Sequence, residues 1–158
     1  CVHPVTWAEL CRDGYAAQGL VPGEAAGVLA LRAGSADALA LIEHCTIHST
    51  RARSLAATLV DAASTLTGMD GVVIAPWGAP PRAVLVEFIR QLYGRLPIVD
   101  VSAALGESLA ATTALAWMAA LDLITADVMR CVLILTAGVD GELGVTVLAR
   151  GVGTCTAP

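Results

Sequence analysis

The stretch from Glu107 to Ile124 limits most strongly how this chain can fold. Its residues are nearly all Ala, Leu, Met, Thr and Trp, and their order predicts a helix without a polar face. Such a helix must be covered on every side. Its uncharged run, Ser108 to Leu121, is shorter than the roughly 20 residues that span a bilayer. We therefore expect a soluble protein in which a sheet covers one side of this helix and another protein surface covers the other.

Short apolar segments alternate with helical patterns along the chain. Strands are predicted at Val28–Leu31, Ala40–Thr50, Gly71–Ala75, Ile98–Ser102, Cys131–Thr136 and Val145–Arg150. Helices are predicted at Arg51–Leu66, Pro80–Tyr93 and Glu107–Ile124. This alternation indicates a mainly parallel sheet with helices on its faces, and the last two strands would add an antiparallel edge. A length of 158 residues fits one domain, in which residues 1–22 form an irregular lead-in.

The charge balance and the cysteines narrow the class of protein. Nine arginines stand against 14 acidic residues, so the net charge is −5 and no basic footprint for nucleic acid exists. Since 56% of residues are hydrophobic and only 15% are charged, we expect another protein to cover part of the surface. The five cysteines form no CxxC pair, and His44 and His48 lack a third metal ligand. These features predict a cytoplasmic protein with no metal, cofactor, nucleic-acid partner or membrane span.

Four short segments together resemble a known family. Gly23–Leu31 (GEAAGVLAL) is similar to the GEGAGVLVL strand entry of β-ketoacyl synthases, and Val72–Gly78 stands where that family runs from a strand into HGTGT. Val101–Glu107 is similar to KSNIGH, and Ala137–Gly141 aligns with the GFGG turn. From about Asp13 to Arg150 the chain resembles the C-terminal half of a β-ketoacyl synthase or of a chain-length-factor-like protein. The resemblance implies a thiolase-like half: a mainly parallel, mixed five-stranded sheet with helices on both faces.

The resemblance also places four residues at a degenerate site. Trp77 stands for the family's first His, Ser102 for its Lys, Glu107 for its second His and Val139 for its gating Phe. An indole has no basic nitrogen, and an ionised carboxylate only accepts hydrogen bonds. We expect all four residues to face the substrate or a partner, and none of them to be catalytic.

Two of these positions carry further expectations. We expect Trp77 to fill the former active-site cavity or to pack at its mouth, with Glu107 and Val139 close by. The alternative for Trp77 is an exposed loop residue. The alternative for Glu107 is a structural role, because a carboxylate near a helix start is favoured by the helix dipole.

The resulting interpretation is a non-catalytic, ketosynthase-like subunit or fragment that pairs with a condensing enzyme in fatty acid or polyketide biosynthesis. Its expected partners are a ketosynthase-like N-terminal half or subunit and, as a further candidate, an acyl carrier protein. One alternative is an active acyltransferase of the β-ketoacyl synthase type whose nucleophilic Cys comes from a separate N-terminal half. The other is an unrelated small α/β binding module. The sequence leaves open the acyl chain length, the pathway, and whether the chain is a separately encoded half or a cleaved fragment.

Overall fold

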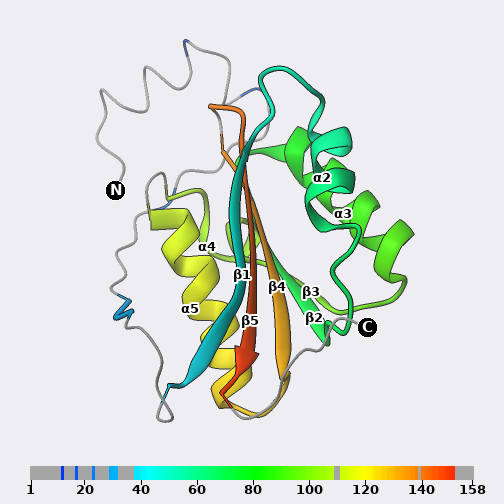
Figure 1. Cartoon of the computed structure of the whole chain (residues 1–158). Helices are drawn as coiled ribbons and strands as arrows, with labels where there is room; N and C mark the ends of the chain where they lie inside the picture. Colours follow the sequence, from blue (N-terminus) through cyan, green and yellow to red (C-terminus); the bar gives the residue numbers. More distant parts are fainter. Residues whose placement is uncertain are drawn as a thin grey trace.

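Nine regular elements make up the described part of the chain (Figure 1). The computed structural model describes residues 12, 17, 23, 29–31, 38–108, 111–138 and 140–151. The elements are β1 (Ala40–Ser49), α2 (Leu55–Ala63), β2 (Gly71–Pro76), α3 (Ala79–Tyr93), β3 (Ile98–Asp100), α4 (Val101–Leu105), α5 (Thr112–Thr125), β4 (Cys131–Ala137) and β5 (Glu142–Arg150). No helix in these ranges is long and apolar enough to cross a membrane.

All five strands form one mixed sheet in the order β1-β5-β4-β2-β3. β2 pairs in parallel with β3 and β4, whereas β5 is antiparallel to both β4 and β1. The α/β class and the mixed five-stranded sheet are confirmed, although only two of the four pairings are parallel. The last two strands, β4 and β5, pair antiparallel as predicted. They do not form the edge of the sheet, because β1 pairs along the outside of β5 from Ala40–Arg150 to Ser49–Glu142. No local pattern reveals a pairing between segments so distant in sequence.

Helices cover both faces of the sheet, as predicted (Figure 1). α2 and α3 pack on one face with Val72 and Ile74 of β2, and α5 packs on the other with Val73 and Ala75. Every residue of β2 is buried. The continuous apolar run at the start of this strand therefore meant burial on both faces, which is typical of a strand inside a parallel pair.

Three predicted element boundaries are wrong, each for a local reason. Leu29–Leu31 is not in a strand, and Val28 lies outside the described residues. The predicted helix Arg51–Leu66 begins only at Leu55, because the Ser54 hydroxyl accepts a hydrogen bond from the Ala57 N–H as an N-cap. The predicted strand Ile98–Ser102 ends at Asp100, whose carboxylate caps α4 in the same way.

The predicted helix Glu107–Ile124 is shorter than expected, and one of its sides is not buried. α5 begins at Thr112, so Glu107 belongs to the connection from α4. The buried side of α5 packs on the sheet through Leu115, Ala116 and Ala120. Its outer side leaves Met118 37% exposed.

Tyr93 links the ends of the two helices on the α2 and α3 face, and this link predicts an alkaline loss of stability. Its hydroxyl donates a 2.8 Å hydrogen bond to the Ala63 carbonyl, and burial raises the pKa of Tyr93 from 10.0 to about 12. Since the folded state holds this proton more tightly, the stabilisation is complete below about pH 10 and is lost as the pH rises through about 12. We expect Tyr93→Phe to lower the free energy of unfolding by about 1 kcal/mol near neutral pH. Urea unfolding should also show a weaker alkaline decline than in the wild type; an unchanged decline would contradict the assignment.

Gly144 tests the packing of β5 against β4. It pairs with Thr136, and a Cβ at Gly144 would overlap the Thr136 hydroxyl. We expect Gly144→Ala to destabilise the fold by about 1–3 kcal/mol. Thr136→Ala in the same chain should recover most of that loss, because it removes the overlapping oxygen. Thermal unfolding of both single variants and the double variant measures the coupling, and strictly additive effects would show that the overlap is not the cause.

Candidate functional site

The candidate site lies where β2 and β4 end. Trp77 directly follows β2, and Gly138 directly follows β4. The Trp77 N–H donates to the Ala137 carbonyl over 2.9 Å, so the two chain ends stay side by side. Gly78 then turns the chain into α3 with a φ of 82°, a conformation that favours glycine. Parallel strands place their ligand crevices at such carboxyl ends.

A pocket of about 260 Å³ opens at this end, between α5 and the sheet. Two indole rings, those of Trp77 and Trp117, contribute to its wall, and Cys45 and Ile47 of β1 lie on the far side. Five threonines also line it: Thr46 of β1, Thr112 and Thr113 of α5, Thr136 of β4 and Thr146 of β5. Glu142 is the charged residue in this lining. The pocket is therefore mainly apolar, with hydroxyl groups and one carboxylate.

Trp77 is half-buried and contributes to this wall, so it is not an exposed loop residue. Its indole nitrogen is buried without a hydrogen-bond partner. A nitrogen shielded from solvent does not face the open pocket, which means that the ring presents carbon atoms to it. Trp77 thus lines a cavity that Gly138 of the predicted turn also lines.

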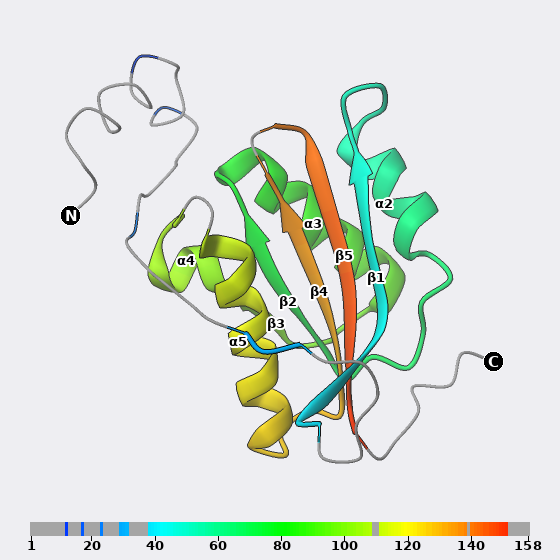
Figure 2. The same cartoon turned by 60° about the vertical axis from the view of Figure 1, so that its left-hand side comes forward.

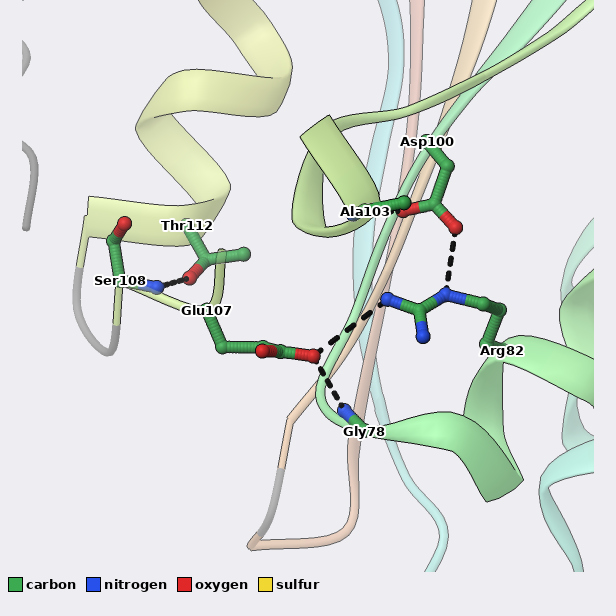
Figure 3. Close-up of polar contacts among 7 residues, drawn as sticks. All are labelled: Gly78, Arg82, Asp100, Ala103, Glu107, Ser108 and Thr112. Atoms are coloured by element: carbon green, nitrogen blue, oxygen red, sulfur yellow. Dashed lines mark hydrogen bonds and ion pairs between the residues drawn. The ribbon is translucent and has the colours of Figure 1, made fainter. Parts of the chain in front are cut away.

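Glu107 is buried beside the turn that follows Trp77, with only 1% of its side chain exposed. Its Oε1 accepts a 3.3 Å hydrogen bond from the Gly78 N–H and lies 3.6 Å from the Arg82 Nη2 (Figure 3). Glu107 therefore interacts with the start of α3, because Gly78 is the N-cap of α3 and Arg82 lies in its first turn. The prediction of a helix-start carboxylate named the wrong helix, although the favourable interaction with a helix N-terminus is present.

Arg82 is the cation that offsets the negative charges of this site. Its Nε donates to Asp100 Oδ2 over 2.7 Å, and the other oxygen of Asp100 accepts from the Ala103 N–H (Figure 3). One guanidinium therefore connects the carboxylate at the end of β3 with Glu107. The sequence analysis missed Arg82 and Asp100. One signal was present: an arginine in the first turn of a helix opposes the helix dipole and calls for a nearby carboxylate.

The other two predicted site residues are placed differently. Ser102 lies on α4, not at the end of a strand, and its hydroxyl is buried without a partner. Val139 lies outside the described residues. The structure therefore joins Trp77 and Glu107 through Gly78, and it shows no contact that would test the alignment of Ser102 or Val139.

The thiol of β1 that lines this pocket was also missed from the sequence. Cys45 has a free thiol, lines the pocket and accepts a hydrogen bond from the Thr146 hydroxyl over 3.6 Å. His44 and His48 both contact the Thr46 hydroxyl, at 3.1 and 2.9 Å. Because side chains alternate along a strand, these imidazoles lie on the opposite face from Cys45.

Two further expectations concern the state of the cysteines and metal binding. Cys131 is buried at the start of β4 and is disulfide-bonded, so its sulfur is not a simple buried thiol. Within the ranges that the structure describes, no group of three His, Cys, Asp or Glu side chains could hold a metal ion.

Comparisons with known proteins identify the fold and no family. No family model matches the chain, and no curated protein matches it. A solved structure described as "AntDE:AntF (apo): type II PKS acyl-carrier protein in complex with its ketosynthase bound to the hexaketide" contains a similar chain, with a TM-score of 0.52 and 6% sequence identity. The match covers 71% of this chain and 34% of that one, so this chain spans about a third of its length. At this identity the likeness shows the fold alone.

The contact between Arg82 and Glu107 predicts a specific pattern of stability. We expect Arg82→Met to cost about 3 kcal/mol, because it leaves the buried Glu107 carboxylate without this cation. Glu107→Gln should cost about 1 kcal/mol, because the amide oxygen still accepts from Gly78. Adding Glu107→Gln to Arg82→Met should recover part of the larger loss. Chemical unfolding measures these values; Arg90→Met, at an exposed position of the same helix, is the control. Equal losses in Arg82→Met and Arg90→Met would contradict this role.

Proposed function

We propose that this chain is a non-catalytic, ketosynthase-like subunit or fragment that pairs with a condensing enzyme in fatty acid or polyketide biosynthesis. Two independent observations support a relation to this class. Four sequence segments resemble the C-terminal half of β-ketoacyl synthases, and the fold is similar to part of a chain from a polyketide synthase complex. In this proposal the described sheet is a thiolase-like half, and a cytoplasmic location belongs to the same proposal.

The interactions of Glu107 are the observation that supports a non-catalytic role for this chain. In the β-ketoacyl synthases that the sequence resembles, the position of Glu107 holds a histidine that donates a hydrogen bond to the substrate. Here the side chain is a buried carboxylate that accepts from the Gly78 N–H and lies beside Arg82. Trp77 stands at the position of the family's other histidine, and it presents ring carbons to the pocket. Neither group supports the stabilisation of a thioester oxyanion, which needs hydrogen-bond donors.

The outer side of α5 supports the pairing part. Ala114, Met118 and Thr125 follow one another at helical spacing on the side of α5 opposite its buried residues. Asp122 is the sole charged residue of this helix. In the thiolase fold the equivalent helix lies in the middle layer between two sheets. We propose that a ketosynthase-like N-terminal half or subunit covers this stripe.

The matched complex suggests a second partner. Its description names an acyl carrier protein bound to a ketosynthase. An acyl carrier protein is therefore a further candidate for this chain, through the partner that supplies the catalytic residues.

The competing candidate is an active synthase; in the sequence-based form its nucleophilic Cys comes from a separate N-terminal half, and Cys45 is the one described thiol of this chain that could take that part instead. This thiol is exposed and lies on the pocket that Trp77 also lines. Its described hydrogen bond comes from a hydroxyl and not from a base, and the imidazoles of β1 lie on the other face. We propose that it is not a nucleophile. Malonyl decarboxylation by the purified chain that is lost in Cys45→Ser would favour the active synthase instead.

The pairing proposal is tested by co-expression. The coding region around Cys1 should be sequenced for a ketosynthase-like N-terminal half, and that half co-expressed with this chain. We expect a complex by sedimentation, and we expect Met118→Arg to weaken it about tenfold or more, since a buried charge in an apolar contact is costly. Val60→Arg is the matched control, because Val60 is an exposed apolar residue on the opposite layer. Finding no such half, together with a stable monomer that binds no hydrophobic dye, would refute the proposal.

A further inference from the structure

The pocket between α5 and the sheet has an apolar floor. Figure 2 shows α5 on one side of this face of the sheet and β1 at the opposite edge. Ala75 of β2 and Ile134 of β4 line the pocket and are only 2% and 1% exposed. Gly144 of β5 lines it as well, and a residue without a side chain leaves the space above β5 open. A ligand can therefore bury an apolar group against this floor.

The open part of the pocket carries one negative charge. Glu142 is exposed and lines the pocket, on the same face of β5 as Gly144 and Thr146 because side chains alternate along a strand. Across the ranges that the structure describes, Glu142 takes part in no ion pair. Arg51, in the turn after β1, donates its Nε hydrogen to the Asp140 carbonyl. The Glu142 carboxylate is therefore free to pair with a charge on a ligand.

The walls of the pocket also favour a cation. Trp77 and Trp117 are both half-buried in them, and indole rings attract cations more strongly than other aromatic side chains do. The Thr146 hydroxyl gives its hydrogen to the Cys45 Sγ, so its oxygen keeps lone pairs for a further donor. Among the described residues of the lining there is no arginine or histidine, and the chain has no lysine. An anionic ligand would thus meet a carboxylate and no compensating cation.

We propose that this pocket binds a small organic cation, a protonated amine carried on a single apolar ring. The ring lies on the floor in contact with the indoles, and the ammonium group lies beside Glu142. The volume of about 260 Å³ is just below the roughly 300–1,000 Å³ of pockets for drug-sized ligands, which suits a molecule of one ring. The proposal does not rest on the proposed function, since it uses neither the loss of catalytic residues nor the pairing through α5.

Calorimetric titration with three matched probes tests the charge preference. Phenethylammonium, phenethyl alcohol and hydrocinnamate all carry a phenyl ring, and they differ in the charge of their terminal group. We expect saturable one-to-one binding of phenethylammonium, binding of the neutral alcohol that is weaker by about fivefold or more, and no detectable binding of the carboxylate. Equal affinities for the ammonium and the alcohol, or no saturable binding of the ammonium, would overturn the proposal.

A substitution at Glu142 tests where the ammonium group lies. Glu142→Gln keeps the size of the side chain and removes its charge, so phenethylammonium should bind about fivefold more weakly and phenethyl alcohol should bind as before. Glu87→Gln is the matched control, because it removes an exposed carboxylate of α3 on the other face of the sheet. It should leave both affinities unchanged. Unchanged binding of phenethylammonium in Glu142→Gln would overturn the proposal.

A blocking substitution tests where the ring lies. Cys45 is exposed and lines the pocket, and an aromatic residue is well tolerated in a strand, so Cys45→Phe should fold and fill the space. We expect it to weaken the binding of both probes about tenfold or more. Val60→Phe, at an exposed position of α2, should weaken neither. Thermal unfolding of each variant shows that it is folded during the titration. Full affinity for phenethylammonium in folded Cys45→Phe would show that the ligand binds elsewhere and would refute the assignment.

Discussion

Burial of β2 and β4 on both faces is the constraint on which the rest of the molecule depends. The two strands pair in parallel over six positions, from Gly71–Val132 to Pro76–Ala137. Because apolar side chains leave both faces, each face needs its own helical layer. The chain supplies α2 and α3 for one face and α5 for the other. Parallel pairing also forces each connection to cross back over the sheet, which places the carboxyl ends of both strands at one end of the molecule.

The candidate site is a consequence of that arrangement. Where the buried strands end, the backbone must leave the sheet, and Gly78 makes that turn with a positive φ. The N–H that this turn exposes is satisfied by Glu107, which reaches it from a segment 29 residues further along the chain. Arg82 compensates the charge that this contact buries, and Asp100 shares Arg82. A structural need, capping the start of α3, is thus met by a carboxylate from a distant segment of the chain.

How well each feature could be predicted from the sequence depends on how far apart in the chain the interacting residues lie. GVVIA and CVLILT were correctly predicted as strands, because a run of consecutive β-branched and aliphatic residues favours a buried strand without help from distant segments. Local caps shifted predicted boundaries by a few residues: Ser54 and Asp100 each satisfy a free N–H and so start a helix. The place of β1 outside β5 was not predictable, because it depends on backbone pairing between segments about a hundred residues apart. The contact of Arg82 with Glu107 was missed for the same reason.

The apolar excess of the composition can now be assigned to particular surfaces. The two core clusters absorb the side chains of β2, β4 and the inner sides of the helices. Of the ten large hydrophobic residues that stay exposed in the described part, three lie on β1 and one, Met118, lies on the outer side of α5. These two surfaces differ in what they can bind. The stripe offers side chains alone, so its partner needs shape and apolar character. The edge of β1 also offers backbone hydrogen bonds, which require a strand and impose a direction and a register. The two surfaces therefore call for different chemistry: the stripe for complementary apolar side chains, the edge for a strand.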